Sequence, residues 1–150
     1  MTGPRIPDRY FGAVVVGAGP CGLAAAISLK KAGLTVRVYD RDCVVSSITQ
    51  YPTYATFFST AEKLSLGGLP FVVPVAKPSR RDALAYYRSV VTYFGIDVRQ
   101  YEAVESITRV HGTFIVRTRR HGEEPRDTRA NSVVVGNWSG DRHSLTSGKR

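Results

Sequence analysis

The sequence predicts an α/β protein with a parallel sheet and a β-meander insertion, and three observations support this prediction. A β-branched run, Ala13–Val16, leads directly into Gly-x-Gly-x-x-Gly and an alanine-rich apolar segment, which indicates a strand, a tight turn and a helix. A second alternating run at 35–39 ends on the acid Asp40. Late in the chain, two alternating runs flank His111-Gly112, a pair typical of a hairpin turn.

The glycine loop at 17–22 has the spacing of a dinucleotide-binding turn. Gly17 permits the tight turn, Gly19 lets the backbone approach phosphates, and Gly22 lets the helix pack on the strand. A helix N-terminus also favours an anion, because its first amides have no partner within the helix. The loop therefore predicts a Rossmann-like domain with a pyrophosphate at the start of its first helix.

Asp40 stands where a ribose ligand is expected, about 20 residues beyond the glycine loop. A carboxylate suits a free ribose 2′-hydroxyl, so NAD or FAD fits better than NADP. The competing interpretation is a βαβ unit without a ligand. We consider it the weaker one, because strand, glycines, helix and terminal acid all occur in one register.

The middle of the chain predicts a long irregular segment and then a second helix. Residues 41–78 have no sustained helical period, apart from a short helical turn expected at 62–66. So long a loop is uncommon unless it serves a function. Ser79 then predicts an N-cap with Asp82 at the third helical position, and Gly95 ends the helix.

The last third predicts strands. A third strand is expected at 96–100, a hairpin at 104–110 and 113–118, and a final apolar strand at 129–135. This order places a meander inside a parallel α/β sheet. It is the arrangement of FAD domains in flavoproteins that bind two dinucleotides.

Composition narrows the class of protein. A chain of 150 residues with 43% hydrophobic content is the size of one globular domain. Two cysteines make no disulfide framework, and no stretch approaches a membrane span, so a cytoplasmic protein is expected. The net charge of +9 gathers late in the chain and predicts a solvated basic edge rather than a nucleic-acid or membrane surface. No His, Cys and Asp cluster has metal-ligand spacing.

Several segments resemble one family, the bacillithiol disulfide reductases, which are flavoproteins distantly similar to thioredoxin reductase. Between about 13 and 135, the resemblance is carried by the blocks 15–26, 47–48, 51–53, 56–60, 66–71, 77–80 and 85–88. The Tyr-Pro-Thr and Phe-Phe-Ser-Thr blocks are far more specific than the glycine motif. Only the N-terminal FAD-binding portion of the family is matched.

The resemblance implies an FAD-dependent pyridine-nucleotide disulfide oxidoreductase that reduces a low-molecular-weight thiol disulfide with NADPH. The family lacks a Cys-x-x-Cys pair, as does this chain. The expected partner is that small-molecule substrate, and a homodimer stays open. The residues expected at FAD are Gly17, Ala18, Gly19, Pro20, Cys21, Gly22, Asp40 and Arg41, with Phe58, Ser59 and Thr60 on the isoalloxazine side.

Cys21 is the expected catalytic residue, with two interpretations left open. The helix N-terminus favours a thiolate, so Cys21 could attack a disulfide and form a mixed disulfide for reduced flavin to resolve. Alternatively, it is only a small residue that allows close packing beside FAD. The family resemblance favours the chemical role.

The chain departs from the family after its last strand. The strand ending at Val135 runs straight into Gly136, as if the usual Ala-Thr pair were missing, and no second glycine motif follows. We therefore expect an incomplete FAD-binding domain at 1–138, a disordered polar tail at 139–150 and no NADPH-binding domain.

Three interpretations follow. The chain is a truncated or frameshifted member that binds FAD but cannot take hydride efficiently, an FAD-binding module that obtains electrons from another chain, or a scaffold without flavin whose basic tail binds nucleic acid. We favour the first.

Overall fold

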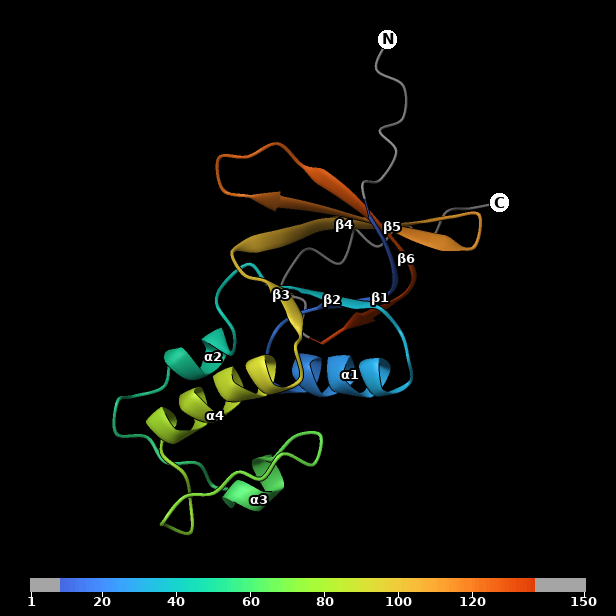
Figure 1. The fold of residues 1–150 in the computed structure, drawn as a ribbon. Helices are drawn as coiled ribbons and strands as arrows, with labels where there is room; N and C mark the ends of the chain where they lie inside the picture. Colours follow the sequence, from blue (N-terminus) through green and yellow to red (C-terminus); the bar gives the residue numbers. More distant parts are fainter. Residues whose placement is uncertain (1–8, 137–150) are drawn as a thin grey trace.

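In the computed structural model, residues 9–136 are described (Figure 1). They form six strands and four helices. Along the chain these are β1 (Tyr10–Val16), α1 (Pro20–Lys31), β2 (Val36–Tyr39), α2 (Ser46–Thr49), α3 (Ala61–Leu64), α4 (Arg80–Tyr93), β3 (Asp97–Arg99), β4 (Glu102–Val110), β5 (Thr113–Arg120) and β6 (Arg126–Val135).

All six strands belong to one sheet with the order β3-β2-β1-β6-β5-β4. Strands β3, β2, β1 and β6 are mutually parallel, whereas β4, β5 and β6 form an antiparallel meander. The long strand β6 joins the two parts, because residues 126–130 pair with β5 and residues 129–135 pair with β1. The predicted fold class, a Rossmann-like parallel sheet with a β-meander, is confirmed.

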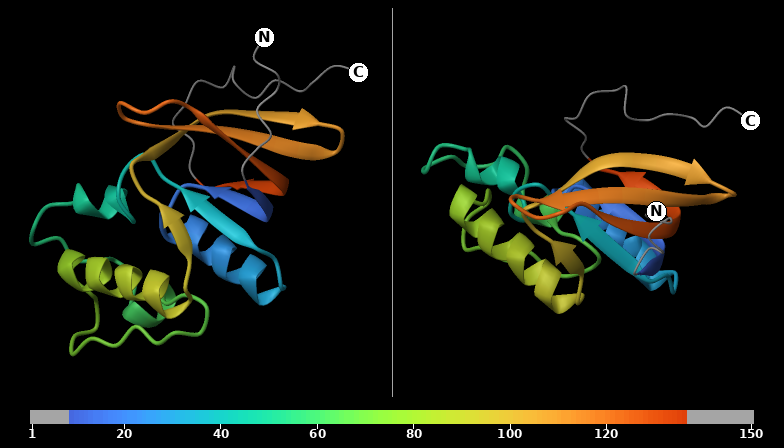
Figure 2. Two further views of the ribbon diagram at one scale, coloured as in Figure 1. Left: turned by 45° about the horizontal axis from the view of Figure 1, so that its top comes forward. Right: turned by 90° about the horizontal axis from the view of Figure 1, so that it is seen from above.

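The parallel strands are covered on both faces, and each face has its own apolar core (Figure 2). Val15 and Val38 point to the helical side, where they join side chains of α1 and α4. Val14 and Val16 point to the other side and meet Ile107 and Val116 of the meander. Alternation of side chains along each strand produces this division.

Helix α4 begins and ends at the predicted residues. The Ser79 hydroxyl oxygen accepts from the Asp82 amide, and the Asp82 carboxylate accepts from the Ser79 amide at 2.9 Å, which completes a capping box. Hydrogen bonds from the Ser79 side chain and backbone lower the pKa of Asp82. Gly95 follows the helix with a φ of 58°, a left-handed conformation that favours glycine.

The segment 41–78 contains the expected helical turn as α3, and also α2, which the sequence did not predict. Figures 1 and 2 show α3 beneath the layer of α1 and α4, on the side away from the sheet. Side chains of both helices hold this segment in place. Arg80 donates to the Thr49 carbonyl at 2.8 Å, Tyr86 to the Leu69 carbonyl at 2.7 Å, and Lys31 to the Gly67 carbonyl at 2.7 Å.

The predicted hairpin turn joins β4 to β5, and its residues His111 and Gly112 have φ values of 47° and 81°. Several arginines of the meander pair with acids. Arg117 meets Asp127 at 2.8 Å, and Arg119 meets Glu105 at 2.6 Å. The predicted disordered tail at 139–150 lies outside the described residues. No helix within residues 9–136 is long and apolar enough to span a bilayer.

Candidate cofactor-binding site

The glycine loop lies at the carboxyl end of β1 and passes into α1 as the sequence predicts. Gly19 is the N-cap of α1, Pro20 opens the helix, and none of the described side chains caps it. A proline is well suited to the first turn, because that position needs no amide donor. The amides of the first turn are therefore left for an external acceptor, which is what an anionic ligand supplies.

The three glycines of the motif have different structural roles. Gly17 has a φ of 103°, which a side chain would strain. A Cβ atom on Gly22 would lie 1.9 Å from the Gly17 carbonyl oxygen, so this glycine permits the loop to pack on the helix. A Cβ on Gly19 would meet no atom within 4 Å. Gly19 therefore faces open space, and the fold itself does not require it to lack a side chain.

Asp40 follows β2 and binds the glycine loop directly. Its Oδ2 atom accepts from the Ala18 amide at 2.7 Å, and its Oδ1 atom accepts from the Asp42 amide at 2.8 Å. The carboxylate is partly exposed, and each oxygen has a further lone pair for a ribose hydroxyl. Arg41 is exposed beside it, with its Nε atom 3.4 Å from Asp42.

The end of β6 closes the site from the other side. The Gly136 amide donates to the Val16 carbonyl at 2.8 Å, and a Cβ on Gly136 would lie 3.1 Å from the Cα atom of Gly22. Gly136 thus lies in close contact with the start of α1, directly after β6.

Val45 also belongs to this site, although no motif in the sequence predicts it. Its amide donates to the Ala18 carbonyl at 2.9 Å, and its φ of 49° is left-handed. A buried valine in that conformation is strained. No local signal identifies such a residue, because valine is usually extended.

Cys21 occupies the first turn of α1 and is exposed, whereas Cys43 is half-buried. Cys21 interacts electrostatically with Tyr87 on α4. Burial, then the charges of Tyr86 and Cys21, raise the pKa of Tyr87 to about 12.

The predicted segment Phe58, Ser59 and Thr60 leads into α3. Phe58 is 96% exposed, and Thr60 precedes α3. Among residues 9–136, no hydrogen bond joins this segment to the glycine loop. Its assignment to the flavin stays a prediction.

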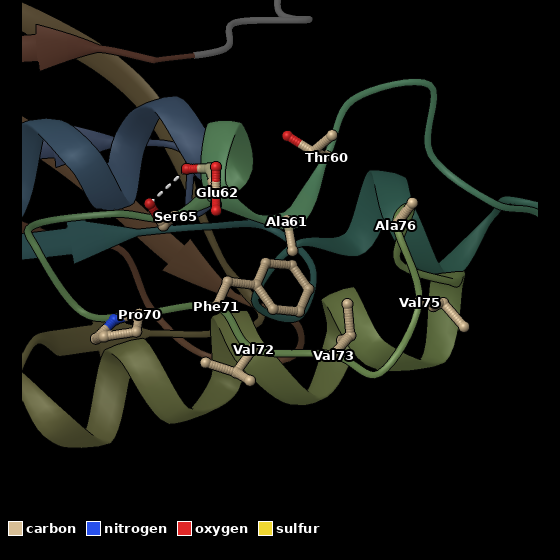
Figure 3. Close-up of a pocket in the computed structure, with 10 residues that line it drawn as sticks. All are labelled: Thr60, Ala61, Glu62, Ser65, Pro70, Phe71, Val72, Val73, Val75 and Ala76. Atoms are coloured by element: carbon tan, nitrogen blue, oxygen red, sulfur yellow. Dashed lines mark hydrogen bonds between the residues drawn. The ribbon is translucent and has the colours of Figure 1, made fainter.

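Thr60 lines an open pocket of about 520 Å³ between α3 and the chain at 70–76 (Figure 3). Its walls are mainly apolar, with Phe71, Val72 and Val73 on one side. Within residues 9–136, no group of three or more His, Cys, Asp or Glu side chains could hold a metal ion.

Comparison with known proteins identifies the family. The family model described as pyridine nucleotide-disulphide oxidoreductase matches residues 14–137. The chain belongs to this family.

Relatives and solved structures show which members of the family this chain resembles. Bacilliredoxin reductase Bdr of Bacillus subtilis (strain 168) is 51% identical over 79 residues, which are 53% of this chain and 24% of that protein. The structure of bacillithiol disulfide reductase Bdr (YpdA) from Bacillus cereus matches with a TM-score of 0.82 and 39% identity, covering 85% of this chain and 39% of that one. The resemblance to the bacillithiol disulfide reductases is confirmed.

More distant relatives share the domain. The indole-3-pyruvate monooxygenase YUCCA6 of Arabidopsis thaliana is 31% identical over 127 residues, 83% of this chain and 30% of that protein. The chain thus spans between 24% and 39% of the length of the relatives named here.

Proposed function

We propose that this chain binds FAD, with the pyrophosphate on the amides of the glycine loop and the adenosine ribose at Asp40. The observation that supports this most strongly is the junction of three segments. The uncapped start of α1, the acid after β2 and Gly136 after β6 meet at the carboxyl edge of the parallel strands. In open α/β sheets this edge is where nucleotides bind.

The residues present fit that cofactor. Gly19 leaves open space over the helix N-terminus, which lets phosphate oxygens approach the amides. The loop also holds Asp40 in place through the Ala18 amide, so the carboxylate is oriented before a ribose hydroxyl arrives. Bound FAD supplies two-electron chemistry between a nicotinamide and a disulfide.

The proposed activity is reduction of a low-molecular-weight disulfide of the bacillithiol type with electrons from NADPH. Its support is the family and the activity of similar proteins, among them a bacillithiol disulfide reductase. A second candidate is an FAD-binding module that needs a partner chain. This chain spans only 24% and 39% of the length of two such relatives, which supports this second candidate.

FAD binding is tested with the purified chain and its Gly19→Val variant. The unchanged chain should bind FAD, whereas Gly19→Val should bind it about a hundredfold more weakly or not at all, because a side chain there stands between phosphate and amides. The variant should keep its circular dichroism, since the backbone at Gly19 is extended and a Cβ there meets no atom within 4 Å.

Gly22→Ala is the contrasting variant, because its Cβ would collide with the Gly17 carbonyl and the fold itself should suffer. Equal FAD affinity of the unchanged chain and Gly19→Val would refute the site. NADPH oxidation with a low-molecular-weight disulfide separates the reductase from the module that needs a partner chain. It is measured with the chain alone and with a cell lysate added. Turnover only with the lysate would favour the module.

A further inference from the structure

Tyr101 is an exposed aromatic residue whose side chain contributes no packing to the fold. It follows β3 with a φ of 56°, and its side chain is 64% exposed. Within residues 9–136 its ring and hydroxyl make no hydrogen bond or ring contact. A bulky residue in the left-handed region is strained, and such strain concentrates at ligand sites.

Backbone hydrogen bonds fix Tyr101 beside the ribose acid. Its amide donates to the Asp42 carbonyl at 3.1 Å, and the next amide, of Glu102, donates to the Asp40 carbonyl at 2.9 Å. On the preceding side, the Gln100 side chain accepts from the Val44 amide at 2.9 Å. The chain on both sides of Tyr101 is therefore bound to the turn that begins at Asp40.

The sheet order sets the direction in which a nucleotide would run. Strands β1, β2 and β3 are parallel neighbours, so their carboxyl ends form one row. That row begins with the glycine loop, continues with Asp40 and ends with Tyr101. Two strand spacings measure roughly 10 Å, which is the order of the reach from a pyrophosphate through a ribose to its base.

We propose that the Tyr101 ring stacks on the adenine of the bound dinucleotide. This inference rests on the proposed FAD site and adds a base-binding residue to it. The ring lies one strand beyond the ribose acid, where the base of a nucleotide bound along this row arrives. A flat aromatic surface at that point accepts the π-face of a purine, and stacking of this kind changes affinity by about tenfold or more.

The test compares Tyr101→Gly, Tyr101→Phe and the unchanged chain in binding titrations with FAD and with FMN, which lacks the adenosine. Glycine removes the ring and also relieves the left-handed strain. Tyr101→Gly should therefore bind FAD about tenfold more weakly, although its thermal stability is unchanged or higher. Tyr101→Phe keeps the ring and should bind FAD like the unchanged chain. FMN affinity should be the same in all three.

His111→Gly is the matched control. His111 is also left-handed, at 47°, but it lies in the hairpin turn at the opposite end of β4, so its replacement should leave FAD binding unchanged. Equal FAD affinity of Tyr101→Gly and the unchanged chain would overturn the stacking role and leave the FAD site standing. An equal loss for FAD and FMN would also overturn it. Failure of the unchanged chain to bind FAD would overturn the site and the stacking role together.

Discussion

Cys21 and Cys43 differ in exposure although both lie close to the glycine loop. Cys21 is exposed in the first turn of α1, whereas Cys43 is half-buried two residues before Val45, whose amide binds the loop. Attack on a disulfide requires access to the sulfur atom, which the exposed Cys21 has and the half-buried Cys43 has less of. This difference predicts selective chemistry at one of two thiols.

We expect Cys21 to form a mixed disulfide with oxidised glutathione about tenfold faster than Cys43. The thiolate attacks one sulfur of the reagent, and the other half leaves as a thiolate. Mass spectrometry of peptides after timed quenching measures both sites. Cys21→Ser should abolish the fast phase, and Cys43→Ser should leave it intact. Equal rates at the two sites would contradict the nucleophile and favour a packing role for Cys21.

Arg37 is a residue whose burial the alternating pattern of its strand does not predict. It stands between valines on β2 and would be placed in solvent by alternation alone, yet it is buried. Its Nη2 atom lies 2.6 Å from Asp97, and the guanidinium lies 4.4 Å from the centre of the Phe11 ring. A buried cation is tolerated only when it is paired, which Asp97 on β3 provides.

At the scale of elements, α4 determines where the segment 62–71 lies. Tyr86 accepts from the Leu66 amide and donates to the Leu69 carbonyl, both at 2.7 Å, and its ring stacks on Phe71. Tyr87 donates to the Leu64 carbonyl at 3.1 Å. Two adjacent buried tyrosines thus hold a segment with little regular structure.

This arrangement predicts an alkaline limit to stability. The folded pKa of Tyr87, about 12, is above its ordinary value of 10.0, so the neutral hydroxyl contributes fully below pH 10 and this contribution is lost as the pH rises through 12. The free energy of unfolding should fall by about 2 kcal/mol across that range because of this group. Denaturant titrations at several pH values measure it.

The controls for that experiment lie on the same helix. Tyr87→Phe should be about 1 kcal/mol less stable at neutral pH, through loss of the hydrogen bond, and should show a smaller decline above pH 10. Tyr93→Phe changes an exposed tyrosine and should decline like the unchanged chain. An identical decline in all three chains would refute the role of Tyr87.

At the scale of the whole molecule, one sheet carries both apolar cores. The helical core and the meander core share the parallel strands, with alternate residues of β1 contributing to each. Loss of β1 would therefore disrupt both cores. We expect the described part of the chain to unfold in one cooperative transition, and a ligand at the carboxyl edge of β1 to stabilise all of it.

The measurement is calorimetry of the chain with and without FAD. At about a hundred times the dissociation constant, FAD should add ~2.7 kcal/mol, which raises Tm by roughly 5 to 10 °C. FMN at the same concentration should raise it less, because it lacks the adenosine. Two separate transitions, with only one moved by FAD, would show that the meander and the helical part unfold independently.

Local patterns determined much of this protein before any tertiary contact was known. The strand, glycine loop and helix at the start, the acid at 40, the capping box at Ser79 and the hairpin turn at His111 each follow from neighbouring residues. Turn chemistry and capping act within a few residues, so the sequence contains their whole cause. The parallel sheet and the nucleotide loop were predictable for this reason.

Only the tertiary structure decided which distant residues meet at that loop. Gly136 lies against Gly22, Val45 binds the Ala18 carbonyl, and Tyr101 stands beyond Asp40, although none of these positions has a local pattern that identifies it. Burial of Arg37 likewise depends on a partner 60 residues away. Such contacts arise from the order of strands in the sheet and from packing, which local propensity does not contain.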